Sequence, residues 1–243
     1  MAQVPEIELK DILLSNSSFG PNEITFILTK VCNDYSQFPN LKEVTGVLES
    51  QLERTPATSV RLGVCQYMIG NYETAIVTLD NADGGALAYF YKGKSQFALH
   101  NWDKAIECYE LAQTTGYNGD HCQIAIAETK RFSKDLSGAM SILDNMFGPI
   151  EQTAEYLYQR GATIAAMSDN PDEVCKLYER AVELEDAHPG ALFGLALEND
   201  RRGNDERAIE LYQRAAASFP TNVGALLNLG LIYEDHDQYE RAT

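Results

Sequence analysis

Basic residues are scarce in this chain of 243 residues. Lysine and arginine together number 19 against 36 aspartate and glutamate residues, which gives a formal net charge of −17. A protein that binds nucleic acid without regard to sequence, or that docks on anionic lipid, needs cationic side chains to neutralise phosphate. The charge balance therefore argues against direct nucleic-acid binding and against membrane docking, and it favours partners that are basic or of mixed charge.

Paired cysteines and long apolar runs are missing as well. The five cysteines are odd in number, and no two of them form a CxxC pair. No apolar run approaches the roughly 18 residues that a membrane-spanning helix needs. The stretch 1–14 is acidic and does not resemble a secretory signal. We therefore expect a reducing, cytoplasmic location without a disulfide framework.

Catalytic and metal-binding groupings are not evident. The histidines fall at or near expected turns, and none has a second ligand at the spacing of a metal site: His100, His121, His188 and His236. The GKS triplet at 93–95 lacks the preceding glycine and the strand-to-helix turn of a phosphate-binding loop. We therefore predict no enzyme activity, no cofactor and no metal, with an enzyme that uses a groove as its pocket as an alternative.

What the sequence does contain is a repeat of about 34 residues. Residues 86–119 show it most clearly, as two amphipathic helical segments joined by a turn at His100-Asn101, with small residues at Gly93, Ala105 and Ala112. The first small position recurs as Gly63, Ala127, Gly161, Ala196 and Gly230, and the second as Ala75, Ala139, Val174, Ala208 and Ala242. Small residues let two helices approach closely, and a single pair cannot bury its apolar face without neighbouring copies.

This pattern resembles the tetratricopeptide repeat, a helix–turn–helix unit. The resemblance implies an all-α fold, a right-handed superhelix (solenoid) of tandem helix pairs. We expect a non-repeat segment at 1–21 and an array over 22–243, divided into 22–55 (degenerate), 56–85, 86–119, 120–153, 154–188, 189–222 and 223–243 (truncated). A last repeat that stops half-way predicts a fragment of a longer protein, with an apolar C-terminal end through which the chain self-associates or from which it frays.

In this family the first helix of each pair lines a concave groove, so the resemblance also implies which residues would contact a partner. These positions combine aromatic with charged side chains: Tyr67, Phe90, Lys94, Phe97, Glu128, Arg131, Phe132, Tyr158, Phe193, Asp200 and Arg201. The alternative is that neighbouring helices bury about half of them. We predict a protein–protein interaction scaffold that binds a peptide or protein in this groove. The pairs Val60/Val64 and Phe90/Lys94 depart from the clamp with which some members hold a terminal carboxylate.

Four phrases carry a narrower resemblance. LSNSSFGPNEI, NADGGALAYF, EYLYQRGAT and ALFGLALENDRRGNDE resemble planctomycete proteins in which such an array precedes a small domain. That domain is similar to the C-terminal domain of the RNA polymerase α subunit, and here it would lie beyond residue 243. The resemblance implies a second alternative, the N-terminal part of a transcription-linked regulator.

Overall fold

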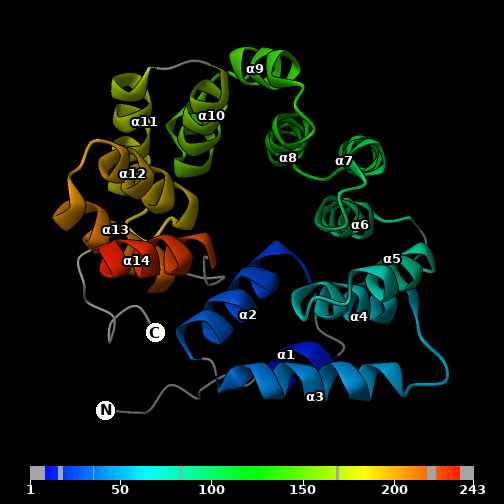
Figure 1. Cartoon of the computed structure of the whole chain (residues 1–243). Coiled ribbons are helices and arrows are strands. Elements are labelled where there is room, and N and C mark those ends of the chain that lie inside the picture. The colour runs from blue at the N-terminus through cyan, green and yellow to red at the C-terminus, as the bar shows by residue number, and fades with distance from the viewer. Residues whose placement is uncertain are drawn as a thin grey trace, which may run out of the picture. The chain divides into compact units, whose positions relative to one another are not determined.

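The computed structural model describes residues 9–15, 19–34, 36–82, 84–167, 170–217 and 223–235, and every regular element in these ranges is a helix (Figure 1). The α-helices are α1 (Leu9–Leu14), α2 (Pro21–Asn33), α3 (Gln37–Glu49), α4 (Pro56–Met68), α5 (Tyr72–Asp80), α6 (Ala86–Ala98), α7 (Trp102–Thr114), α8 (Gly119–Phe132), α9 (Leu136–Asp144), α10 (Ala154–Met167), α11 (Pro171–Leu184), α12 (Pro189–Arg201), α13 (Asp205–Ala217) and α14 (Val223–Asp235). A short 3₁₀ helix, η1 (Pro149–Gln152), precedes α10. The predicted all-α fold class is confirmed. Within the described residues, none of the helices is both long and apolar enough to cross a membrane.

The chain forms two compact units, Met1–Thr129 (unit 1) and Lys130–Thr243 (unit 2). The boundary falls inside α8, so unit 1 holds α1 to α7 and most of α8, and unit 2 holds the end of α8 and all that follows. The repeat period does not indicate this division, because it runs through the boundary unchanged. A solenoid permits such a division, since each repeat contacts only its neighbours. The expected turn at His236 and the small position at Ala242 lie outside the described residues.

Helix pairs build both units, and neighbouring pairs within a unit pack on one another. In unit 1, α4 contacts α5 and α6 contacts α7, while α5 and α4 both contact α6. In unit 2, α10 contacts α11 and α12 contacts α13, while α11 and α10 both contact α12 and α13 contacts α14. Within each unit, the first helices of successive pairs therefore lie next to one another, and the face that they share is called here the first-helix face of that unit. Figure 1 shows α6 beside α7 and α12 beside α13.

Small residues sit at the closest contacts between paired helices, as the repeat predicts. A Cβ atom added to Gly93 would lie 2.6 Å from the Tyr109 ring, and one added to Gly161 would lie 2.9 Å from the Tyr178 ring. Ala105 and Ala208 have no exposed surface. Larger side chains at these positions would have to displace their neighbours, because helical cores are close-packed.

The turns inside the pairs repeat one backbone geometry. Gly70, His100, Lys134 and Gly203 each have a positive φ, between 60° and 86°. In each turn the next residue donates its N–H to the carbonyl five residues before it, as Asn101 does to Gln96 at 2.9 Å. This is the hydrogen bond with which a left-handed residue ends a helix, and it sets the angle at which the second helix returns.

A further hydrophobic cluster precedes the regular pairs in unit 1. It joins α1 to α4 through buried aliphatic residues: Leu9, Leu13, Ile27, Val31, Leu41, Val44, Leu48 and Leu62. The sequence analysis placed 1–21 outside the repeats, and within this segment the structure shows the helix α1. Leu9 and Leu13, one turn apart on α1, are both buried, because α1 packs against α3.

Candidate partner-binding surface

Three of the predicted groove residues in unit 1 meet around a single ammonium group. Lys94 on α6 places its Nζ 5.8 Å from the ring centroid of Tyr67 on α4 and 5.7 Å from that of Phe90. Tyr91 contributes a third ring, 6.0 Å away. A cation within about 6 Å of a ring is attracted by its electron-rich face. The first-helix face of α4 and α6 thus carries a positive charge among aromatic rings.

Further rings hold this arrangement in place. The Tyr67 and Tyr91 rings meet edge to face at 5.4 Å, Phe90 stacks on Tyr117 at 4.1 Å, and Phe90 meets Tyr109 at 5.5 Å. These five side chains, called here the aromatic cluster, come from α4, α6, α7 and the turn before α8. Tyr67 and Tyr117 are partly exposed, whereas the other three are buried. Phe90, Tyr91 and Tyr109 therefore form the buried part of the cluster, and solvent reaches Tyr67 and Tyr117.

The Lys94 ammonium, which lies among the rings of the aromatic cluster, is the positive charge at this site. The phenol of Tyr67 raises the pKa of Lys94, burial lowers it, and Tyr91, Tyr109 and the Glu128 carboxylate raise it further, so the pKa lies above its usual value. Burial raises the pKa of Tyr91 and of Tyr109. Near neutral pH these tyrosines are uncharged and Lys94 is an ammonium.

Two other predicted residues of unit 1 lie beside the cluster. Phe97, at the end of α6, packs edge to face on Trp102 with the ring centroids 5.4 Å apart. Glu128, on α8, is partly exposed, and its carboxylate contributes to the raised pKa of Lys94. The groove positions that the family resemblance implies include Tyr67, Phe90 and Lys94, but not Tyr91, Tyr109 and Tyr117.

The predicted residues of unit 2 do not gather in the same way. Arg131 lies over the Phe132 ring at 4.6 Å, and its Nη2 donates a hydrogen bond of 3.0 Å to Gln159. Phe132 is 46% exposed. Arg201 is exposed and pairs with Glu198 at 2.8 Å. The charged side chains of Arg131 and Arg201 thus bind residues of unit 2 itself.

The remaining predicted side chains of unit 2 serve mainly its packing. Tyr158 contacts the rings of Tyr178 and His188. Phe193 packs near Tyr212, with centroids 5.9 Å apart. Asp200 accepts a hydrogen bond of 3.1 Å from the Tyr212 hydroxyl. These contacts leave Tyr158, Phe193 and Asp200 partly buried, whereas Phe90 of unit 1 is buried.

A polar network in unit 2 escaped the sequence analysis. Gln159 donates to Glu155 at 2.9 Å, and the other Glu155 oxygen lies 3.0 Å from Nε2 of His188. Nδ1 of His188 accepts the Ala191 N–H at 3.1 Å, so the ring hydrogen sits on Nε2 and points to Glu155. Only the position of His188 before Pro189, at a helix start, hinted at this role. The network ties α10 to the first turn of α12.

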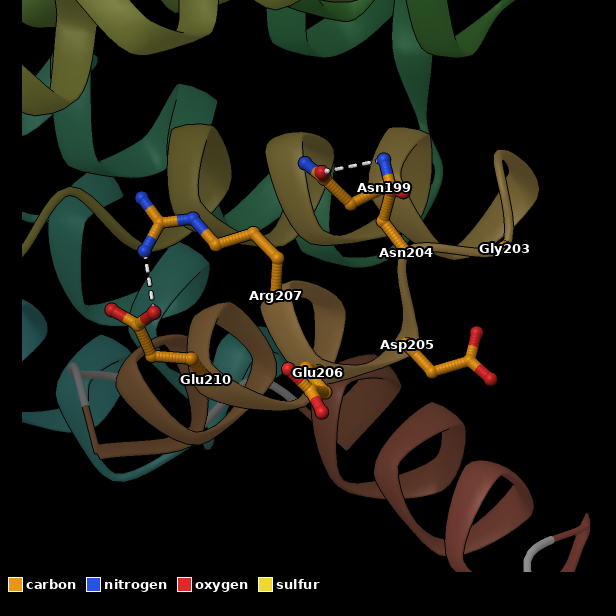
Figure 2. A pocket seen from close by; sticks show the side chains of 7 residues that line it. All are labelled: Asn199, Gly203, Asn204, Asp205, Glu206, Arg207 and Glu210. Atoms are coloured by element: carbon orange, nitrogen blue, oxygen red, sulfur yellow. Dashed lines mark hydrogen bonds and ion pairs between the residues drawn. The ribbon is translucent and has the colours of Figure 1, made fainter.

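An open pocket lies at the turn between α12 and α13 (Figure 2). Its lining is polar and includes three acidic residues: Asn199, Gly203, Asn204, Asp205, Glu206, Arg207 and Glu210. In Figure 2 Arg207 reaches the Glu210 carboxylate and Asn204 faces Asn199. Acidic residues in the first turn of α13 interact favourably with its N-terminal dipole, which accounts for the charge here without a ligand.

The cysteines Cys65 and Cys122 are buried in the structure. Burial raises the pKa of the Cys65 thiol to about 12 and that of Cys122 to about 11. A thiol must ionise to act as a nucleophile, so these cysteines are inert near neutral pH. Across the parts of the chain that the structure describes, no group of three or more His, Cys, Asp or Glu side chains is placed to hold a metal ion.

Comparison with known proteins identifies the repeats. Two family models described as tetratricopeptide repeat match residues 176–223 and 211–243. A photosystem I assembly protein, Ycf3, of Prochlorococcus marinus (strain NATL2A) is 31% identical over 110 residues, which is 43% of this chain and 61% of that protein. The protein of the same name from Synechococcus sp. (strain CC9605) is 34% identical over 82 residues, 32% of this chain and 47% of its own length. The chain thus spans about half to three fifths of these relatives.

Solved structures agree on the fold. A tetratricopeptide repeat protein from Parabacteroides merdae ATCC 43184 aligns with a TM-score of 0.63 and 15% identity, over 90% of this chain and 89% of that one. A thermophilic protein of the same repeat class from Thermus thermophilus aligns with a TM-score of 0.60 and 21% identity, over 74% of this chain and all of its own length. These matches show that the chain shares the fold of these repeat proteins, a solenoid of tandem helix pairs. The transcription-linked role stays a prediction.

Proposed function

We propose that this chain, as a solenoid of tetratricopeptide repeats, is a non-catalytic scaffold that binds a peptide or protein segment along its first-helix face. The observation that carries the proposal is the aromatic cluster of unit 1. Aromatic side chains that are held rigidly and left partly exposed lose little entropy on binding, and they are enriched among residues that dominate interface energies. Tyr67 has this character, and the Lys94 ammonium beside it adds a positive charge.

Two further arguments support a scaffold. The inert thiols and the polar pocket at the α12–α13 turn offer no reaction centre. The curated relatives are named as assembly proteins, and a protein that brings subunits together needs binding surfaces rather than catalytic groups. We extend this to an assembly role for the present chain in the cytoplasm, with partners that its net charge of −17 attracts over long range.

Site-specific crosslinking tests the location of the surface. A photo-crosslinking residue, p-benzoylphenylalanine, replaces Tyr67 on the first-helix face in one variant. In a matched control it replaces Val77, which is 64% exposed on the second helix α5. We expect discrete adducts with partner proteins from position 67 and few from position 77. Equal adducts from both positions, or adducts from position 77 alone, would place the binding surface elsewhere.

A further inference from the structure

The aromatic cluster holds a cation that lacks a counter-charge bond. Among the described residues, no hydrogen bond or ion pair involves the Lys94 ammonium, whose contacts are the three rings already described. Lys92, two positions earlier on α6, pairs instead with Asp80. An ammonium has three N–H donors, and rings satisfy its charge only in part. Lys94 thus retains hydrogen-bonding capacity that its neighbour has used.

Solvent reaches part of the Lys94 side chain. Lys94 is partly exposed, and its Nζ is not among the buried, unpartnered polar atoms of the described residues. The surrounding rings of Tyr67, Phe90 and Tyr91 exclude water from most of the lysine side chain. A charged group with low-dielectric walls attracts an opposite charge more strongly than one in bulk water, because screening there is weaker. The site is therefore preorganised for an anionic group that approaches from the open side.

We propose that Lys94 and the aromatic cluster form a receptor for a single carboxylate side chain, an aspartate or glutamate flanked by apolar residues in a partner segment. This inference rests on the proposed function and specifies what the first-helix face of unit 1 recognises. The carboxylate accepts hydrogen bonds from the Lys94 ammonium, and the apolar flanks pack on the exposed edges of Tyr67 and Tyr117.

The charge around the site limits the partner to one acidic group. Glu128 on α8 lies close enough to influence Lys94 electrostatically, and the whole chain carries a net charge of −17. A polyanion such as nucleic acid, or a run of acidic residues, is repelled at long range. A segment with one carboxylate and neutral or basic flanks does not experience this repulsion. Glu128 competes with the partner's carboxylate for the Lys94 ammonium, so it weakens binding of the partner segment and speeds its dissociation.

Selection from a phage-displayed peptide library on the intact chain provides the probe. We expect the selected peptides to share one aspartate or glutamate between apolar residues. Replacing that residue by its neutral amide in the best peptide should weaken binding to the wild-type chain about tenfold or more, as loss of a charge-assisted hydrogen bond does. Because this comparison alters only the peptide, it does not depend on the folding of any protein variant.

Three protein variants complete the test. Lys94→Met keeps the aliphatic stem and should bind the acidic peptide about tenfold more weakly, with no further loss for its amide form. Lys92→Met, the matched control, should leave the affinity unchanged. Glu128→Gln should tighten the acidic peptide, because a competing carboxylate is removed.

The outcomes separate this inference from the proposed function. Selected peptides that lack acidic residues, yet lose affinity when Tyr67 is replaced by alanine, would overturn the carboxylate receptor and keep the first-helix face as the binding surface. A Lys94→Met variant that binds the acidic peptide normally would do the same. A library that yields no peptide sensitive to Tyr67 or Lys94 would overturn both proposals.

Discussion

At the scale of single residues, the turns inside the helix pairs carry measurable strain. Four of these turns require a positive φ, which glycine adopts freely at Gly70 and Gly203. Two of them use residues with a side chain, His100 at 60° and Lys134 at 72°. A left-handed conformation costs a non-glycine residue roughly 1–2 kcal/mol, because Cβ approaches the following carbonyl oxygen.

Lys134→Gly should therefore stabilise unit 2. The relief of strain exceeds the extra backbone entropy that glycine loses on folding, which is about 0.5–1 kcal/mol, so we expect a net gain of up to about 1 kcal/mol. Urea denaturation of the intact chain measures it. Gly70→Ala makes the reverse change at the equivalent turn of unit 1 and should destabilise by a similar amount. A Lys134→Gly variant that is less stable than the wild type would contradict this account of the turns.

Ala208 tests the close contacts between paired helices. It lies on α13 without exposed surface, at the position where the repeat requires a small residue. Ala208→Leu should destabilise unit 2 by about 1–3 kcal/mol, because the larger side chain forces α12 and α13 apart. Ala217→Leu makes the same substitution at an exposed position at the end of α13 and should change stability by less than about 0.5 kcal/mol. Equal effects would mean that helix spacing does not depend on this position.

At the scale of the helix, α9 begins with a charged cap. Asp135 accepts hydrogen bonds from the Lys130 ammonium at 2.6 Å and from the Gly138 N–H at 2.9 Å. The bond from Lys130 and that from Gly138 hold the pKa of Asp135 below its usual value. A carboxyl group with a lowered folded-state pKa adds stability above its unfolded-state pKa, and this stability is lost as the pH falls through the folded-state value.

Asp135→Ala should therefore lower the urea midpoint at pH 7, and its difference from the wild type should shrink as the pH falls below about 4. Asp135→Asn is the matched control, since it keeps a capping oxygen but cannot ionise. That variant should keep part of the stability and show less pH dependence between about pH 3 and pH 5. A deficit for Asp135→Ala that stays constant down to about pH 3 would exclude a role for the carboxylate charge.

The sequence predicted the elements better than the site. A period of about 34 residues with small residues at fixed places requires paired helices, because only tight pairs demand those sizes. The family resemblance, applied to this register, implied that Tyr67, Phe90 and Lys94 line one face. It missed Tyr91 and Tyr117, because the direction of a side chain near a helix edge depends on the packing of the next helix, which periodicity does not encode.

At the scale of the whole molecule, the face of α14 is an apolar surface at the end of the described array. Ala225 and Ile232 are buried, whereas Leu227 and Leu231, one turn apart, are 64% and 58% exposed. Earlier in unit 2, the next helix along the chain packs on α11, on α12 and on α13. We expect this face to drive self-association of the chain, since solenoids depend on their outermost faces being covered.

Replacing Leu227 and Leu231 by glutamate tests this expectation. The wild-type chain should show a molar mass that rises with concentration in sedimentation, and the double variant should remain monomeric. Val77→Glu changes a 64% exposed apolar residue in unit 1 and should leave the association intact. A wild-type chain that is monomeric throughout the concentration series would show that this face is covered or does not associate.

The chain has one tryptophan, Trp102, at the first position of α7 in unit 1, where it packs on Phe97 and contacts His100. Its fluorescence therefore reports on one of the two units, whereas the circular dichroism of the helices reports on both. If the units unfold separately, the two signals will give different denaturation curves on the same sample. The protein thus contains a natural optical label for unit 1 and requires no engineered dye to follow the unfolding of that unit.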